Sequence, residues 1–217
     1  FPTETVYGVG VRTGCARARR RLARMKGRDA GKPFQLLVAD LAAALRLCPR
    51  MPEAAARLGR ACWPGPLTLV TQAGNGRWVG LRVPDHAVAR RLIRAAGGAL
   101  TATSANLSGK PPPTTAADAL AALGAGPDLV LDGGPARYRQ ASTVVRVGRS
   151  GGELLREGAI AAEVVNRILG ATGASGRRSR AHKVHDSGGR TDEDRRRMGS
   201  SRTPFPGRRG ARARPTG

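Results

Sequence analysis

Apolar residues recur with a helical period in several stretches of the chain, and turn residues separate these stretches. Asp40 and Thr115 stand directly before two of the stretches, where a side-chain oxygen can accept a hydrogen bond from the first helical turn. The arginine-rich stretch after Cys15 places Leu22 and Met25 on its inward face. The pattern predicts helices at residues 16–25, 41–47, 52–62, 87–96, 116–123 and 161–169.

Short apolar and β-branched runs lie between the predicted helices. In the extended segment at residues 1–10, Thr3 and Thr5 fall on one side, because side chains alternate along an extended backbone. Helices that alternate with strands are typical of an α/β protein. The runs predict strands at residues 34–38, 67–70, 78–83, 100–103, 129–131, 140–147 and 153–158.

The chain has 217 residues, which is enough for one domain with a buried core. Only 3% of the residues are aromatic, so Ala, Val and Leu must form most of that core. The apolar periodicity stops near Gly170, and we predict a folded domain at 1–170 and a disordered tail rich in Arg, Gly and Ser at 171–217. Because the chain begins at Phe1, within a strand-to-turn junction, we expect an N-terminal strand of the fold to be missing from it.

The formal net charge is +23, and both predicted regions share the excess of basic residues. A domain this basic is expected to attract polyanions such as nucleotides and RNA. An arginine bias from a GC-rich genome would produce the same composition, so both explanations stay open. The three cysteines form no C-x-x-C pair, which fits a reducing, cytoplasmic compartment, and no apolar run is long enough for a membrane helix.

The predicted strand at 100–103 opens into a polar loop at residues 104–109, with the sequence SANLSG. Ser104 and Asn106 supply hydroxyl and amide groups, and Gly109 lets a ligand approach the backbone closely. Such a junction is a usual place for an anion or a sugar in an α/β protein. A Ser/Asn turn without a ligand fits the same residues.

Two further features concern cations. Lys26, Arg28 and Lys32 lie on a loop with two glycines, which predicts a phosphate cradle. The loop does not match a P-loop, and a solvated basic loop is the alternative.

Arg82 lies inside an apolar strand, where an unpaired charge is unfavourable. We therefore expect Arg82 to grip a carboxylate or a phosphate; the alternative is an arginine at a surface edge.

Several short motifs, taken together and in order, resemble the YrdC-like family of threonylcarbamoyl-AMP synthases. Each motif alone is weak, but the ordered set is specific and spans residues 1 to about 169. The motifs are PTETVYG at 2–8, KGR at 26–28, KP at 32–33, WPGPLT at 63–68, RVP at 82–84, SANLSG at 104–109, STV at 142–144 and LREG at 155–158.

The resemblance implies an α/β fold, with a twisted mixed sheet flanked by helices and a concave basic face. It also implies a nucleotidyltransferase that makes threonylcarbamoyl-AMP and pyrophosphate from L-threonine, bicarbonate and ATP. Mg²⁺ would bind through the phosphates of ATP, and the protein itself would hold no metal. The product would serve N6-threonylcarbamoyladenosine modification of tRNA next to the anticodon, through downstream threonylcarbamoyl-transferase proteins.

The family roles fall on matching positions of this sequence. The resemblance implies a threonine-binding group of Thr5, Arg82 and Ser142, and an ATP-binding group of Arg28, Lys32, Ser104, Asn106 and Arg156. Catalysis would come from positioning and from cations around the phosphates, namely Lys26, Arg28 and Arg156. Leu37, Pro112 and Trp78 depart from the family pattern, which often has a threonine-contacting histidine, an ATP-contacting serine and a threonine at these places.

A non-catalytic module of the same fold that binds double-stranded or structured RNA is the main alternative. Such a module would not need the complete set of predicted threonine- and ATP-binding side chains. A carbamoyl-transferring relative from hydrogenase maturation is a third interpretation, which is less favoured because those proteins carry additional domains that this sequence does not show.

Overall fold

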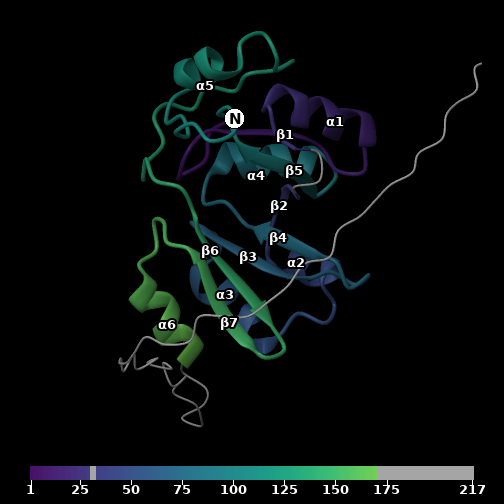
Figure 1. Ribbon diagram of the computed structural model, residues 1–217, viewed down its shortest axis with the longest axis vertical. Coiled ribbons are helices and arrows are strands. Elements are labelled where there is room, and N and C mark those ends of the chain that lie inside the picture. The colour runs from purple at the N-terminus through teal and green to yellow at the C-terminus, as the bar shows by residue number, and fades with distance from the viewer. Residues whose placement is uncertain (30–32, 171–217) are drawn as a thin grey trace, which may run out of the picture. The chain divides into compact units, whose positions relative to one another are not determined.

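The computed structural model describes residues 1–29 and 33–170 (Figure 1). The predictions for Lys32 and for the tail at 171–217 therefore lie outside the described residues. The strands are β1 (Gly8–Arg12), β2 (Gln35–Val38), β3 (Leu67–Gln72), β4 (Trp78–Arg82), β5 (Ala99–Ser104), β6 (Thr143–Gly148) and β7 (Gly151–Arg156). The helices are α1 (Ala16–Met25), α2 (Leu41–Leu47), α3 (Glu53–Cys62), α4 (Ala87–Ala95), α5 (Ala116–Leu123) and α6 (Ala162–Gly170).

The strands form one seven-stranded sheet in the order β1-β5-β2-β4-β3-β6-β7. The pairs β2–β4 and β3–β6 are parallel, and the other neighbouring pairs are antiparallel. The sheet is therefore mixed, which confirms the predicted fold class. All six predicted helices are present, with bounds that differ from the predicted ones by at most one residue.

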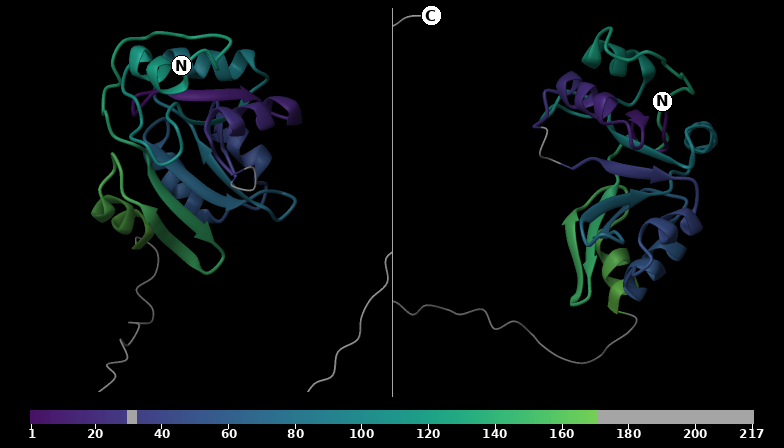
Figure 2. Two further views of the ribbon diagram at one scale, coloured as in Figure 1. Left: turned by 45° about the horizontal axis from the view of Figure 1, so that its top comes forward. Right: turned by 90° about the vertical axis from the view of Figure 1, so that its right-hand side faces the viewer.

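The central strands have one packed face and one open face, because their side chains alternate in direction. Leu67 and Leu69 of β3 belong to the main hydrophobic core, whereas Thr68 and Val70 line a cavity on the other face. The helices α2, α3 and α6 contribute residues to this core and lie against the central strands (Figure 2). The open face of β2, β4, β3 and β6 is thus the place where a ligand can reach the sheet.

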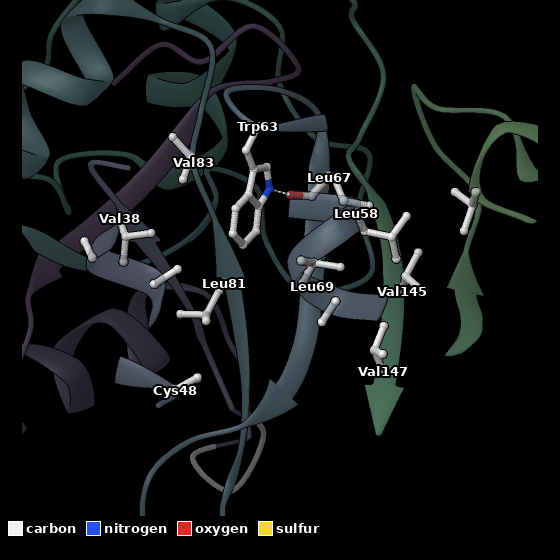
Figure 3. Packing of buried hydrophobic residues seen from close by; sticks show 14 residues of the cluster. Val38, Cys48, Leu58, Trp63, Leu67, Leu69, Leu81, Val83, Val145 and Val147 are labelled. Carbon is white, nitrogen blue, oxygen red and sulfur yellow. Dashed lines mark hydrogen bonds between the residues drawn. The ribbon is translucent and has the colours of Figure 1, made fainter. Parts of the chain in front are cut away.

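Trp63 anchors the core at the turn between α3 and β3 (Figure 3). Its indole Nε1 donates a hydrogen bond to the carbonyl of Leu67, at 2.7 Å. The predicted helix caps are confirmed, since Asp40 accepts from the amide of Ala43 at 2.7 Å and Thr115 accepts from that of Asp118 at 3.1 Å. Side-chain caps of this kind satisfy amide groups that have no partner within the helix.

Two predictions about strands are corrected. Residues 129–131 pair with no strand, and Leu129 is 70% exposed. Residues with a high strand propensity form a strand only beside another strand, and this segment reaches no edge of the sheet. The segment instead lines an apolar cavity of about 240 Å³ beside α1 and α5. The first strand occupies Gly8–Arg12 rather than the beginning of the segment at 1–10, where Thr3 accepts from and donates to nearby backbone groups and holds a turn.

Candidate functional site

A cavity of about 440 Å³ opens on the free face of the central strands. Its wall includes residues from β2, β3, β4, β5 and β6 and from the loops that follow α1 and β5. Among the described residues that line it, Arg28, Arg82, Lys110 and Arg156 are basic and none is acidic. The cavity can therefore attract an anionic ligand.

Arg82 projects into this cavity from the end of β4 and is 3% exposed. Its Nε donates to the carbonyl of Gly65 at 3.3 Å, and its Nη2 donates to Oγ1 of Thr5 at 2.8 Å. The same Nη2 forms an ion pair with Oε1 of Glu4, also at 2.8 Å. Nη1 makes no hydrogen bond with any described residue, so its two N–H groups are the ones available to a ligand.

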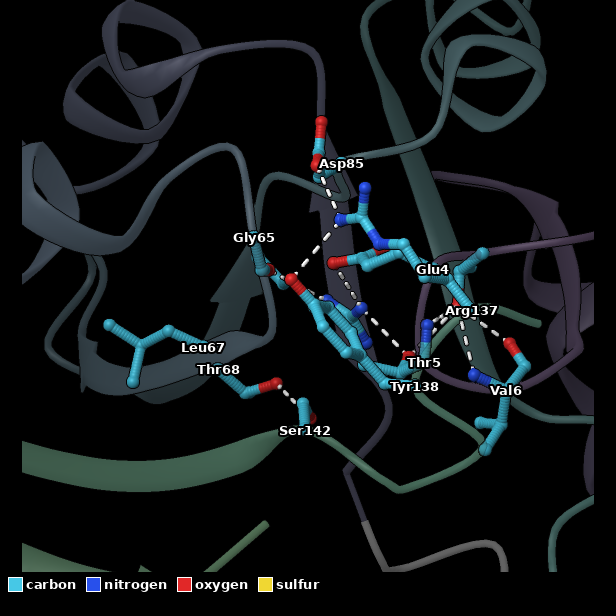
Figure 4. A network of polar contacts seen from close by, with 12 residues as sticks. Glu4, Thr5, Val6, Gly65, Leu67, Thr68, Asp85, Arg137, Tyr138 and Ser142 are labelled. Carbon is cyan, nitrogen blue, oxygen red and sulfur yellow. Dashed lines mark hydrogen bonds and ion pairs between the residues drawn. The ribbon is translucent and has the colours of Figure 1, made fainter. Parts of the chain in front are cut away.

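Glu4 and Thr5 lie behind Arg82 rather than in the cavity wall, and Figure 4 shows both in the polar network around Gly65. Thr5 is fully buried, and its hydroxyl also contacts the hydroxyl of Thr3 at 2.9 Å. The structure thus brings the predicted threonine-binding residue Thr5 next to Arg82, but it places the Thr5 side chain where it touches Arg82 and not the cavity. An added side chain at Gly65 would come within 2.4 Å of the carbonyl oxygen of Cys62, so this tight turn requires glycine.

Ser142 and Arg156 form a second part of the wall. The guanidinium of Arg156 donates to the carbonyl of Ser142 through Nε at 3.2 Å and through Nη2 at 2.8 Å. The hydroxyl of Ser142 lies 2.9 Å from that of Thr68, which in turn donates to Gln35 at 3.1 Å. Burial lowers the pKa of Arg156, and the nearby charge of Arg82 adds a smaller effect in the same direction.

The polar loop after β5 is tied to the end of α1 by Lys26. Its Nζ donates to the carbonyls of Ser104 and Asn106, each at 2.6 Å, and lies 3.4 Å from Oδ1 of Asn106. The amide of Asn106 donates to the carbonyls of Leu107 and Lys110, at 2.8 and 2.6 Å. Lys26 is buried and does not line the cavity, so the structure places it under the loop rather than in the wall.

Ser104, Asn106 and Arg28 line the cavity directly. The hydroxyl of Ser104 makes no hydrogen bond with a described residue. Arg28 donates through Nη2 to the carbonyl of Pro33 at 2.9 Å, and its guanidinium lies 5.1 Å from the centre of the Phe34 ring. These contacts hold the guanidinium at the cavity while leaving its charge unpaired by any carboxylate that the structure describes.

Stability is expected to depend on pH through Lys26. Burial, with a smaller repulsion from Arg28, lowers the pKa of Lys26 from 10.5 to about 8. Between these values the unfolded chain holds more protons than the folded one, so this group makes the free energy of unfolding rise with pH by up to about 1.4 kcal/mol per pH unit.

Urea unfolding of the wild-type protein and of Lys26→Met at about pH 8 and about pH 10 measures this effect. The difference in free energy of unfolding between the wild-type protein and the variant is expected to shift in favour of the wild-type protein from about pH 8 to about pH 10. A difference that stays constant between the two pH values would contradict the prediction.

The three departures from the family pattern all lie at the site. Trp78 and Pro112 line the large cavity, and Leu37 lines a pocket of about 20 Å³ that adjoins it at Arg82. Leu37 is buried, so it contributes apolar surface where the family pattern has a polar group. These positions are therefore part of the cavity walls and not remote changes.

Several polar wall residues, among them Thr68, Gln35 and Lys110, and one buried acid were not predicted as site residues from the sequence. Thr68 and Gln35 line the cavity, and Glu4 pairs with Arg82. Glu4 and Thr68 fall inside the motifs at 2–8 and 63–68, so the motifs contained the signal. Nothing in the local pattern at Gln35 distinguishes it from an ordinary strand residue.

The structure also bears on metals and membranes. Within residues 1–29 and 33–170, no group of three or more His, Cys, Asp or Glu side chains is arranged to hold a metal ion. No helix in that part of the chain has the length and apolar character that crossing a membrane requires.

Residues 1–158 match the Sua5/YciO/YrdC family, whose description reads "Telomere recombination". The threonylcarbamoyl-AMP synthase of Pyrococcus abyssi is 35% identical over 179 residues, which cover 78% of this chain and 53% of the relative. That of Thiobacillus denitrificans is 40% identical over 167 residues, which cover 72% of this chain and 86% of the relative. This chain thus spans about half the length of the P. abyssi protein.

Solved structures agree with this match. The crystal structure of P. abyssi Sua5 complexed with L-threonine has a TM-score of 0.74 and 34% identity, and the match covers 78% of this chain and 53% of that one. Escherichia coli YciO, with a TM-score of 0.68 and 22% identity, supports the fold alone. The family match, the relatives and the fold agree with the motif resemblance, and the chain belongs to the Sua5/YciO/YrdC family.

Proposed function

We propose that this protein is a threonylcarbamoyl-AMP synthase, which uses L-threonine, bicarbonate and ATP and releases pyrophosphate. The observation that carries the proposal is the cavity in which Arg82, Ser142, Arg28, Ser104 and Arg156 converge from five separate segments of the chain. The name of the relatives and the threonine bound to P. abyssi Sua5 support it.

L-Threonine is assigned to the end of the cavity at Arg82. Nη1 of Arg82 would donate to the carboxylate, and the hydroxyl of Ser142 would contact the amino acid. Thr5 would act by holding Nη2 of Arg82, since its own hydroxyl does not line the cavity. The small pocket beside Leu37 would take the methyl group of threonine, because its volume of about 20 Å³ suits a group about the size of a water molecule.

ATP is assigned to the part of the cavity wall formed by Arg28, Ser104 and Arg156. Arg28 and Arg156 would contact its phosphates, and Ser104 would donate or accept through its free hydroxyl. Asn106 and Lys26 would act by shaping the loop, since their polar atoms already bond to loop carbonyls. Lys32, which the structure does not describe, keeps its proposed place beside the phosphates.

The chemistry needs positioning rather than a side-chain nucleophile. The amine of threonine forms a bond with the carbon of CO2 derived from bicarbonate and loses a proton, which gives a carbamate. A carbamate oxygen then attacks the α-phosphorus of ATP, and the bond to the β-phosphate breaks as pyrophosphate leaves. Arg28 and Arg156 would stabilise the charge that develops on the phosphate oxygens.

A divalent cation would enter as part of the substrate. The described cavity wall has no carboxylate to serve as a ligand for Mg²⁺, so the protein residues present do not fit a metal site of their own. Mg²⁺ would instead be held by the phosphates of ATP.

The transfer of a nucleotidyl group from ATP would make the enzyme a nucleotidyltransferase, which we place in the cytoplasm. Its product would pass to transferase proteins that modify tRNA.

Pyrophosphate release with ATP and bicarbonate, with and without L-threonine, tests the proposal. Release is expected to depend on threonine and to fall about a hundredfold in Arg156→Ala, because a cation at the phosphates is lost. Arg167→Ala on α6 is the matched control and is expected to keep wild-type release. A folded protein that releases no pyrophosphate but retains double-stranded RNA on a filter would favour the RNA-binding module instead.

A further inference from the structure

The arginines of the large cavity differ in whether a carboxylate balances their charge, and the difference depends on one buried side chain. At the amino-acid end, Arg82 is paired with Glu4, and the two residues are 3% and 2% exposed. Arg28 and Arg156, the other two arginines of the cavity wall, form no ion pair within the described part of the chain, and their hydrogen bonds go to uncharged groups. The charge of Arg82 is therefore balanced by a carboxylate, whereas the charges of Arg28 and Arg156 are not.

We propose that Glu4 sets the charge selectivity of the amino-acid end, so that it accepts a zwitterionic amino acid and excludes a phosphate group. The proposal rests on the function proposed above. The pair of Glu4 and Arg82 carries no net charge, as does a zwitterion, whereas the unpaired guanidinium groups of Arg28 and Arg156 match a polyphosphate. Glu4 lines neither the large cavity nor the small pocket beside Leu37, so it would act through Arg82. It is therefore a positioning and specificity-determining residue.

The proximity of the arginines makes this selectivity necessary. Arg82 lies close enough to Arg156 to lower its pKa beyond the effect of burial, so a phosphate held by one is within electrostatic reach of the other. Without a counter-charge, both substrates would compete for the same cations. A carboxylate fixed behind Arg82 removes that attraction for polyanions and still leaves Nη1 free to donate.

The surroundings of Glu4 support a role for its charge. The backbone carbonyl of Glu4 accepts from the amide of Tyr138 at 2.7 Å, which fixes the residue in place. Neither Oε1 nor Oε2 accepts a hydrogen bond from a described residue, so the ion pair with Arg82 is the polar contact that the structure shows for this carboxylate. A carboxylate in this setting acts mainly on its nearest cation, which is Nη2 of Arg82 at 2.8 Å.

Inorganic pyrophosphate is the probe for this proposal, with calorimetric binding of threonine as the readout. In the wild-type protein, pyrophosphate is expected to displace ATP but not threonine. The Glu4→Gln variant keeps the shape of the side chain and removes its charge, so pyrophosphate is expected to displace threonine from it as well. Its affinity for pyrophosphate at the threonine site is expected to be about tenfold or more higher than that of the wild-type protein. Glu4→Asp keeps the charge and is expected to retain the wild-type pattern.

A Glu4→Gln variant that folds, binds threonine and keeps the wild-type pattern would overturn the proposal. If Glu4→Gln does not fold, the wild-type protein alone decides the question. Displacement of threonine by pyrophosphate from the wild-type protein would overturn the proposal, and retention of threonine would support it. Binding is measured without turnover, so a protein that binds threonine but releases no pyrophosphate would contradict only the proposed function.

Discussion

Replacement of Arg82 by methionine is expected to abolish threonine-dependent pyrophosphate release and to weaken threonine binding about a hundredfold or more. Hydrogen bonds to charged groups contribute about 1.5–3 kcal/mol each, and Nη1 of Arg82 offers two N–H groups to the substrate carboxylate. Calorimetric titration of the folded variant with threonine measures the loss. Affinity for ATP is expected to change far less, because the phosphates are assigned to other arginines.

The same substitution has a cost in stability that must be separated from the loss of binding. It leaves Glu4 buried without its cation, and breaking a buried ion pair costs about 3–5 kcal/mol. The double variant Glu4→Gln/Arg82→Met removes both charges and is expected to recover much of that stability while still failing to bind threonine. Arg137→Met is the matched control, since Arg137 pairs with Asp85 nearby but lies outside the cavity. Near-normal threonine affinity in the folded double variant would refute the assignment of Arg82.

Replacement of Lys26 by methionine is expected to weaken ATP binding about tenfold or more while leaving threonine binding nearly unchanged. Lys26 is the tie between α1 and the polar loop, and its loss leaves the carbonyls of Ser104 and Asn106 without their donor. Leaving buried acceptors unsatisfied costs about 1–3 kcal/mol each, so the loop is expected to move away from its ATP-binding position. Thermal shifts with ATP and with threonine, measured separately, compare the two effects.

Two further variants sharpen this test. Arg24 lies on the exposed side of α1, in its last turn. The Arg24→Met variant is expected to bind ATP like the wild-type protein. Lys26→Arg keeps the charge but replaces a compact ammonium by a planar fork, so it is expected to restore ATP binding only in part. Equal losses of ATP and threonine affinity in Lys26→Met would show that Lys26 supports the fold in general and not the loop.

The sequence predicted the helices well because their signals are local. The caps at Asp40 and Thr115 act within one turn, and the apolar period of α1 depends on neighbours three and four residues away. Strands were predicted less well. Residues 129–131 have the composition of a strand but reach no free sheet edge, and strand formation depends on such non-local pairing.

The sequence predicted several of the side chains that meet at the cavity but not how they are arranged, and their roles stay a prediction. The ordered motifs named Arg28, Arg82, Ser104, Ser142 and Arg156, and the structure brings all five to one cavity. The contacts made by Lys26, Thr5 and Asn106 were not predicted. Each of these polar groups bonds to protein atoms around the cavity, and a motif does not state whether a side chain faces a ligand or supports a neighbour.

The sequence by itself determined the helices, the alternation that separates a packed face from an open one, and the family to which the chain belongs. These properties follow from residue order over short distances. Only the tertiary structure decided that Glu4 neutralises Arg82, which is distant in the chain, and that Lys26 lies under the polar loop. The physical reason is that a charge acts through space, so its partner is set by how strands and loops pack and not by its place in the sequence.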